Sequence, residues 1–267
     1  MSAGGNRGGG RGSNRRRSRS RFGRKPAAML AVAVVALVGW LFNSADAGSF
    51  LERIESEIAG AGGGSTTAEV AGAEVSPSEA EQARSRLDNL AVSAPRSEGT
   101  YDREQWEHWS AASTSGWGES LNGQSLAGCD ARDAALVRDG RSVEVYGEYC
   151  SLEGSWTGPY SGFQTADSSE MDIDHIVPLA AAHRSGGYAW SAAEKEAYAN
   201  DPSVLLTTSA EANRAKSDQT PDEWMPANES YHCRYAVEWI SVKAEYGLTV
   251  SSSERSALQS ELESCAA

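Results

Sequence analysis

The sequence predicts an α+β fold: a small scaffold of helices and a β-hairpin around a strand–strand–helix (ββα) unit, followed by C-terminal helices. Apolar and polar residues alternate over 143–149, which indicates a strand, and 152–156 is placed to pair with it after a turn at Glu153-Gly154. Residues 170–218 have the order strand, loop with an inserted helix, strand, helix. From 229 onward, apolar residues recur at helical spacing.

The N-terminal part of the chain has the composition of a targeting region. Residues 1–25 contain nine basic residues and no acidic one, and their Gly, Arg and Ser content predicts a disordered basic tail. The sixteen residues 27–42 carry no charge, and Ala-x-Ala follows at 45–47. Residues 26–47 therefore fit a cleaved signal peptide or a membrane anchor through 27–42. Either one places the remaining chain outside the cytoplasm, secreted or membrane-anchored.

A folded domain is expected over 79–267, after a short helix and a flexible linker at 48–78. Ser76 and Glu79 form a capping-box pattern with Pro77 at the first helical position, so a helix should begin there. Trp106 and Trp109 are three residues apart, which suits one face of a helix, and we interpret them as core residues. We expect a monomer.

The four cysteines predict two disulfides. They are Cys129, Cys150, Cys233 and Cys265, and no pair has the C-x-x-C spacing of a structural zinc site. An even number in an exported domain is typical of disulfide bonding. Three connectivities are possible, and proximity in the sequence favours Cys129–Cys150 and Cys233–Cys265.

The central unit, residues 170–218, is predicted to contain two strands and two helices. A strand is predicted over 171–179, ending at Pro178, with Asp172 and Asp174 on one face and Ile173 and His175 on the other. A capping box at 191–194 should begin a helix that extends to about 199. A short strand at 204–207 and a helix at 211–217 follow.

Three helices are predicted after the central unit. A capping-box pattern at 220–223 indicates the first, and apolar spacing over 229–246 indicates a long second helix that ends at Gly247. A further box at 251–254 begins the last helix, with Leu258 and Leu262 facing inward. Cys233 and Cys265 then lie on consecutive helices.

Three residues of the central unit combine a potential general base with two potential metal ligands, which is the chemistry that hydrolysis of a phosphodiester needs. His175 has an intrinsic pKa that suits a general base. Asp174 offers a carboxylate oxygen and Asn213 an amide oxygen, the hard ligands that Mg²⁺ or Mn²⁺ prefers. The cation would stabilise charge on the phosphoryl oxygens and on the leaving oxygen.

The spaced motifs resemble the HNH (ββα-metal) endonuclease family. The sequence Asp-His-Ile-Val-Pro at 174–178 and Asn-Arg-Ala-Lys-Ser-Asp at 213–218 is similar to the HNH domain of CRISPR RNA-guided nucleases. A group of exported bacterial HNH proteins is closer still, because they also have a Tyr-Asp-Arg segment, here 101–103, and counterparts of 183–186 and 231–233. The resemblance covers about 85–265.

The resemblance implies a role for each matching residue. His175 would be the general base, and Asp174 and Asn213 would bind the metal. Asp172 and Lys216 would hold these ligands in position without binding the metal themselves, or would contact the phosphate. Arg184 could bind a phosphate with both guanidinium nitrogens or form a salt bridge.

One position departs from the family. The middle Asn of the motif, which braces the loop between the strands, falls at Val204, and valine cannot donate or accept that hydrogen bond. Asn200 or Asp201 could substitute for it. The other histidines, His108, His183 and His232, are interpreted as structural.

Two functions are compatible with these residues. The first is a metal-dependent endonuclease that acts outside the cytoplasm on nucleic acid, DNA in preference to RNA. The second is a catalytically impaired HNH-like envelope protein that serves as a binding or structural module. Without residues 1–25 the chain has 24 − 9 = 15 basic and 37 acidic residues, a balance of −22, which favours the second function because nucleic-acid binders are usually basic. The complete set of Asp174, His175 and Asn213 favours the first.

Overall fold

The computed structural model describes residues 74–96 and 100–265. The predicted basic tail, the signal or anchor segment and most of the linker lie outside these residues. Contacts divide the chain into two units at residue 65, and every described residue belongs to the second. Within the described residues, no helix has both the length and the apolar character needed to cross a membrane.

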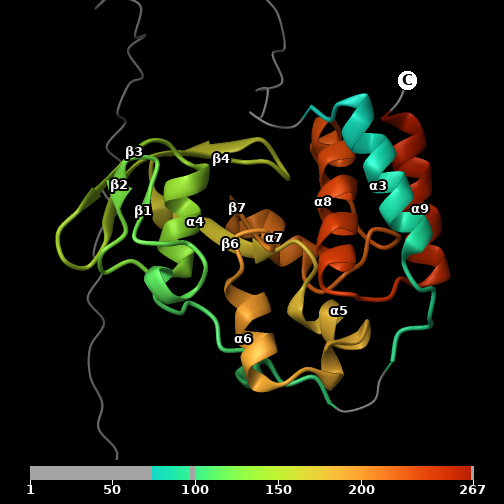
Figure 1. The fold of residues 1–267 in the computed structure, drawn as a ribbon. Helices are drawn as coiled ribbons and strands as arrows, with labels where there is room; N and C mark the ends of the chain where they lie inside the picture. Colours follow the sequence, from blue (N-terminus) through green and yellow to red (C-terminus); the bar gives the residue numbers. More distant parts are fainter. Residues whose placement is uncertain (1–73, 97–99, 266–267) are drawn as a thin grey trace, which may run out of the picture. The chain divides into compact units, whose positions relative to one another are not determined.

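The domain is an α+β structure with small antiparallel sheets, as predicted (Figure 1). Helix α3 (Pro77–Asn89) begins at the expected capping box, in which Ser76 and Glu79 bond reciprocally. It packs against α8 (His232–Glu245) and α9 (Ser252–Ser264), which also contact each other. The predicted inward residues Leu258 and Leu262 are fully buried in this group.

The C-terminal helices differ from prediction at two places. A 3₁₀ turn, η6 (Glu229–Tyr231), precedes α8, so the long helix begins three residues late. The helix expected at 220–223 does not form: the Thr220 N–H donates to the Glu223 carboxylate as in a capping box, but the Glu223 N–H bonds the Thr220 backbone carbonyl, and only a turn follows. Pro226 explains this, since a proline disfavours helical geometry in the residue before it and cannot donate a backbone hydrogen bond.

The scaffold before the central unit combines α4 (Ala131–Asp139) with a three-stranded sheet of order β3-β4-β5. Its strands are β3 (Arg141–Tyr146), β4 (Ser151–Gly158) and β5 (Phe163–Thr165), so the predicted hairpin is confirmed and gains a third strand. Its turn is at 147–150, and the turn predicted at Glu153-Gly154 is wrong because both residues lie within β4. A further hairpin of β1 (Ser120–Leu121) and β2 (Gln124–Ser125) was not predicted. Its Asn122-Gly123 turn has positive φ at both residues, as tight hairpin turns require.

The helix expected around Trp106 and Trp109 is absent. Only two short 3₁₀ turns, η2 (Arg103–Gln105) and η3 (Ala112–Thr114), form in this segment. Trp106 is buried in the core as predicted, but Trp109 has a φ of 66° and is only half-buried. The segment is therefore held by side-chain contacts rather than by helical hydrogen bonds.

The ββα unit lies between two hydrophobic cores. Strand β6 (Met171–His175) pairs antiparallel with β7 (Leu205–Ser209), and α7 (Ala210–Lys216) follows. Met171, Ile173 and Leu205 pack into the core of α4 and β4, whereas Ile176 and Val204 pack into the helical core. The unit therefore joins the two halves of the domain.

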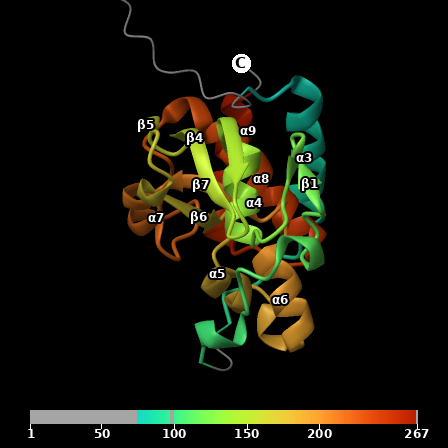
Figure 2. The ribbon, with the colours of Figure 1, turned by 90° about the vertical axis from the view of Figure 1, so that its left-hand side faces the viewer.

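The loop between β6 and β7 contains α5 (Leu179–Arg184), η5 (Gly187–Ala189) and α6 (Ala192–Asn200). Figures 1 and 2 show α5 and α6 together at one end of the domain, away from β3 and β4. Strand β6 is four residues shorter than predicted, because Pro178 caps α5 instead of ending a strand. The capping box of α6 is confirmed.

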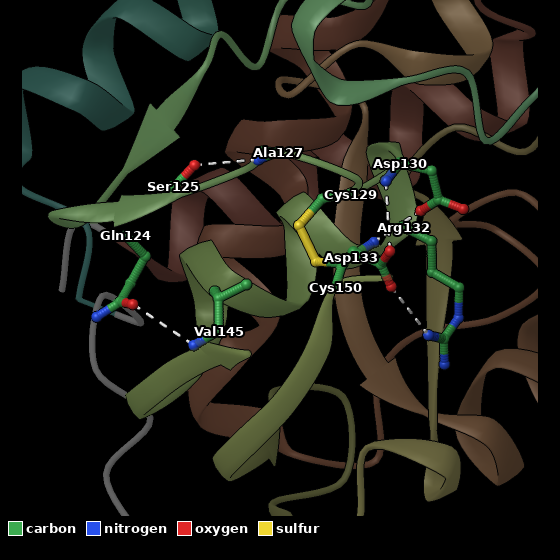
Figure 3. The surroundings of a disulfide bond; sticks show 9 residues. All are labelled: Gln124, Ser125, Ala127, Cys129, Asp130, Arg132, Asp133, Val145 and Cys150. Carbon is green, nitrogen blue, oxygen red and sulfur yellow. Dashed lines mark hydrogen bonds and ion pairs between the residues drawn. A yellow bond between two sulfur atoms is a disulfide. The ribbon is translucent and has the colours of Figure 1, made fainter. Parts of the chain in front are cut away.

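Both predicted disulfides are present. Cys129–Cys150 joins the segment before α4 to the turn between β3 and β4 (Figure 3). Cys233–Cys265 joins the first turn of α8 to the end of α9. Cys129–Cys150 therefore crosslinks the half of the domain that contains α4 and the β3-β4-β5 sheet, and Cys233–Cys265 crosslinks the half that contains α3, α8 and α9.

Candidate active site

A cavity of about 480 Å³ opens where β6 ends. Asp174 and His175 contribute from β6 and Asn213 from α7, so the three residues predicted to perform the chemistry line one cavity. Arg103 of η2 and Arg214 of α7 also line it. Neighbouring side chains of a strand point to opposite faces, and Asp174 and His175 share the cavity because the strand ends at His175.

The His175 imidazole is held in one orientation. Its Nε2 lies 2.9 Å from the carbonyl oxygen of Ala199, at the end of α6. A carbonyl only accepts, so Nε2 carries the proton and the lone pair is on Nδ1. Burial, together with the positive charge of Arg103, lowers the pKa of His175 to about 3, although the hydrogen bond to Ala199 opposes the shift. The ring is therefore neutral at ordinary pH and can accept a proton.

The Asp174 carboxylate is buried and already bonded. The Lys216 Nζ lies 2.9 Å from Oδ1 and 2.8 Å from Oδ2, and the Tyr160 hydroxyl donates to Oδ2 at 2.7 Å. Burial raises the pKa of Asp174 and lowers that of Lys216, while their mutual attraction opposes both shifts. Lys216 also donates to the carbonyl oxygen of His175 at 3.0 Å, so one ammonium ties the two cavity residues together.

The Asn213 side chain faces β6 from α7. Its Nδ2 donates to Asp172 Oδ2 at 3.3 Å, which orients the amide. Asp172 itself does not line the cavity. Its carboxylate therefore acts on the site through Asn213.

The donor set fits one hard divalent cation. A carboxylate has about four lone-pair positions, and the contacts to Asp174 occupy three, which leaves one on Oδ1. The Asn213 amide donates through nitrogen to Asp172, so its oxygen remains available as a ligand. Two protein ligands with waters and phosphate oxygens suit Mg²⁺ or Mn²⁺.

Another group of potential ligands in the described residues does not fit a metal. Cys129, Asp133 and Cys150 lie within 4.8 Å of one another. Both sulfurs belong to a disulfide, so no thiolate can form (Figure 3).

Asn200 makes the kind of contacts that Val204 cannot. Its Oδ1 accepts from the backbone N–H of Ser110 at 2.9 Å, and its Nδ2 donates to the carbonyl oxygens of Glu107 and Glu196. Val204 is buried in the helical core. Because Asn200 follows Ala199, these hydrogen bonds hold the residue that orients His175.

The aromatic segment 106–109 covers one side of the His175 ring. Trp109 lies with its ring centroid 6.1 Å from that of His175 and tilted by 33°. The neighbouring ring of His108 lies 5.2 Å from Trp109, and its Nδ1 donates to the carbonyl oxygen of Trp106. Trp109 has positive φ, a strained conformation that surrounding contacts must maintain.

The remaining predicted residues do not line the cavity. Arg184 donates to a carboxylate oxygen of Asp218 at 2.7 Å and to its backbone carbonyl at 2.9 Å, so a salt bridge engages it. His183 is buried against the rings of Tyr101 and Tyr188. His232 donates to the carbonyl oxygen of Pro226, away from the cavity.

Some site residues were missed by sequence reasoning. Arg103 and Arg214 lie within the segments 101–103 and 213–218 that resemble the HNH family, and this position could have identified them as site residues. Tyr160 carried none, because its hydrogen bond to Asp174 depends on the packing of the segment after β4.

Comparison with known proteins finds one matching family and a similar secreted protein. Residues 145–260 match the family described as GmrSD restriction endonucleases, C-terminal domain. An uncharacterized secreted protein of the fungus Arthroderma benhamiae is 37% identical over 188 residues, which cover 70% of this chain and 86% of the relative. No solved structure matches.

The family match indicates an HNH-like nuclease class. The chain belongs to the family of GmrSD restriction endonuclease C-terminal domains. HNH-type families are typically metal-dependent and imply a nucleic-acid substrate. The secreted relative and the two disulfides indicate an extracellular location. The predicted HNH resemblance is thus confirmed at the level of the family, and the narrower likeness to exported bacterial proteins stays a prediction.

Proposed function

We propose that the protein is a monomeric, metal-dependent endonuclease that cleaves nucleic acid, DNA in preference to RNA, outside the cytoplasm. One observation carries the proposal: a neutral His175 faces the same cavity as Asp174 and Asn213, with its Nε2 tied to Ala199. Of the reactions that such a set supports, hydrolysis of a phosphodiester uses all three residues.

His175 would accept the proton of the attacking water at Nδ1. The hydrogen bond from Nε2 to Ala199 keeps the ring from rotating during this transfer. The low pKa of the ring makes it a weak base in the free protein. A bound phosphodiester places negative charge beside the ring and raises that pKa, so the base strengthens when substrate binds.

Asp174 and Asn213 would hold a divalent cation, Mg²⁺ or Mn²⁺, which supplies charge stabilisation at the phosphoryl and leaving oxygens. Lys216 and Tyr160 fix the Asp174 carboxylate by hydrogen bonds at 2.7–2.9 Å. Asp172 orients the Asn213 amide in the same way. These contacts would keep both ligands in place before the cation binds.

A plasmid nicking assay with the purified full chain tests the proposal. Wild-type protein should nick supercoiled DNA with Mg²⁺ or Mn²⁺ and lose activity with EDTA. His175→Ala should reduce nicking by at least about a hundredfold. His232→Ala, a histidine outside the cavity, is the matched control and should nick like wild type. Absence of nicking by wild type, or equal nicking by His175→Ala, would contradict the enzyme proposal.

The second candidate is a catalytically impaired HNH-like protein that binds or has a structural role. It is favoured by the Asp174 carboxylate, in which contacts from Lys216 and Tyr160 leave one lone pair for a metal. This candidate predicts DNA binding without nicking, or neither.

A further inference from the structure

We infer that Arg103 and Arg214 form a two-arginine clamp that binds backbone phosphates of the nucleic acid at the mouth of the cavity. The inference rests on the proposed function, since it identifies how that site holds its polyanionic substrate. Both arginines line the cavity and both are exposed. They come from different parts of the chain, the η2 turn and helix α7.

The charge balance of the cavity singles out these arginines. The acidic residues that line it are Asp174 and Asp218, and each is paired with a cation outside the lining. Lys216 neutralises Asp174, and Arg184 neutralises Asp218. Arg103 and Arg214 therefore give the cavity a net charge of about +2, in a chain whose residues 26–267 have a balance of −22.

The two arginines differ from most others in the described part of the chain. Neither has a carboxylate within salt-bridge distance there, whereas most arginines do. The paired ones are Arg84, Arg132, Arg138, Arg184, Arg234 and Arg255. An arginine that keeps its guanidinium available can bind phosphate with two parallel hydrogen bonds.

Each arginine is adjacent to a residue of the proposed chemistry. Arg103 lines the same cavity as His175, and its guanidinium lies 3.5 Å from Nε2 of His108. Arg214 follows Asn213 directly on α7 and also lines a neighbouring cavity of about 750 Å³. A phosphate at Arg103 would lie next to the general base, and Arg214 would bind the strand where it continues toward the second cavity. This arrangement fits a polymer rather than a single nucleotide.

The test measures binding separately from cleavage. The full chain with His175→Ala serves as the parent, and its affinity for a fluorescently labelled DNA duplex is measured by anisotropy at several salt concentrations. Arg103→Gln and Arg214→Gln should each weaken binding about tenfold and lower the salt-dependence slope by roughly 0.9. Arg141→Gln, an exposed arginine of β3 that does not line this cavity, is the control and should bind like the parent.

Two further variants separate charge from geometry. Arg103→Lys and Arg214→Lys should recover most of the salt-dependence slope but only part of the affinity, because lysine lacks the planar fork. If both glutamine variants bind like the parent, or Arg141→Gln weakens binding equally, the clamp is wrong and the enzyme proposal stands. If the chain does not nick DNA, yet binding depends on both arginines, the enzyme proposal is wrong and the clamp stands. No binding by the parent overturns the clamp.

Discussion

The Lys216 Nζ lies 2.8 Å from Asp174 Oδ2, and the two side chains are 0% and 5% exposed. This buried ion pair joins the helix of the ββα unit to its first strand. It means that the carboxylate proposed to bind a metal is also part of the core, so its charge is balanced before any cation arrives. Stability and function are therefore coupled at this pair.

We predict that Lys216→Met lowers the free energy of unfolding by about 3–5 kcal/mol, because it leaves the Asp174 carboxylate buried without a partner. The double variant Asp174→Asn with Lys216→Met should recover part of this loss. Lys195→Met is the matched control: Lys195 is also buried, but its hydrogen-bond partner is the neutral amide of Gln105, so its loss should be smaller. Urea unfolding followed by circular dichroism measures all three, and equal losses for both single variants would contradict the prediction.

Asn200→Ala should disturb the position of the His175 ring, although the substitution is not at His175 itself. The variant removes the side-chain hydrogen bonds to Ser110, Glu107 and Glu196, and the freed segment would no longer fix the Ala199 carbonyl. We expect a loss of about 2–3 kcal/mol in the free energy of unfolding and, because small misplacements are costly, about a hundredfold lower nicking rate.

Two comparisons make this positioning role testable. Asn89→Ala, an exposed asparagine on α3, should leave both stability and nicking unchanged. The ring-proton signals of His175 in NMR spectra should shift in Asn200→Ala and stay constant in Asn89→Ala. A stability loss with unchanged His175 signals would assign Asn200 to the core alone.

The sequence predicted those parts of the site that depend on local chemistry. The capping boxes of α3, α6 and α9 place helix starts through contacts between neighbouring residues, so they could be identified without the fold. That Asp174, His175 and Asn213 line one cavity could be predicted because all three belong to one ββα unit. The pairing of the cysteines followed from their proximity along the chain.

The unpredicted parts depend on contacts between distant segments. Thr220 is an exception, because its pattern matches the true caps in sequence and the nearby Pro226 prevents a helix from forming there. Tyr160 reaches Asp174, and Asn200 reaches Ser110, 90 positions away, only after the two halves of the domain pack. The net charge of the cavity could not be predicted either, because it depends on which cation pairs with each acidic residue in the folded structure.

Glu238 should make the domain less stable as the pH rises from about 4.5 to about 7. Burial raises the pKa of this carboxyl from 4.5 to about 7, while the Tyr231 hydroxyl donates to it at 2.7 Å. Between these values the folded state keeps the proton and the unfolded state releases it, so rising pH favours unfolding. Because the residue is only partly shielded from solvent, we expect a loss of about 1–2 kcal/mol.

Glu238→Gln stays neutral at every pH and can still accept the Tyr231 hydrogen bond. Its free energy of unfolding should therefore vary less between pH 4.5 and 7 than that of wild type. Glu263→Gln, an exposed glutamate on α9, should keep the wild-type pH dependence. Urea unfolding at several pH values gives the comparison, and parallel curves for wild type and Glu238→Gln would show that another group is responsible.

The two disulfides should contribute separately to stability, because each closes a loop within one half of the domain. The bonded cysteines are 21 and 32 positions apart, so loop closure predicts about 3–4 kcal/mol for each bond. Replacing Cys233 and Cys265 together by serine should also loosen α9, whose Leu258 and Leu262 pack in the helical core. Hydrogen exchange should then rise in α9 and remain unchanged in α4, with the opposite result for the Cys129 and Cys150 pair. A peptide map of the oxidised protein that links Cys129 to Cys233, or exchange that rises equally in both helices for either variant, would contradict this independence.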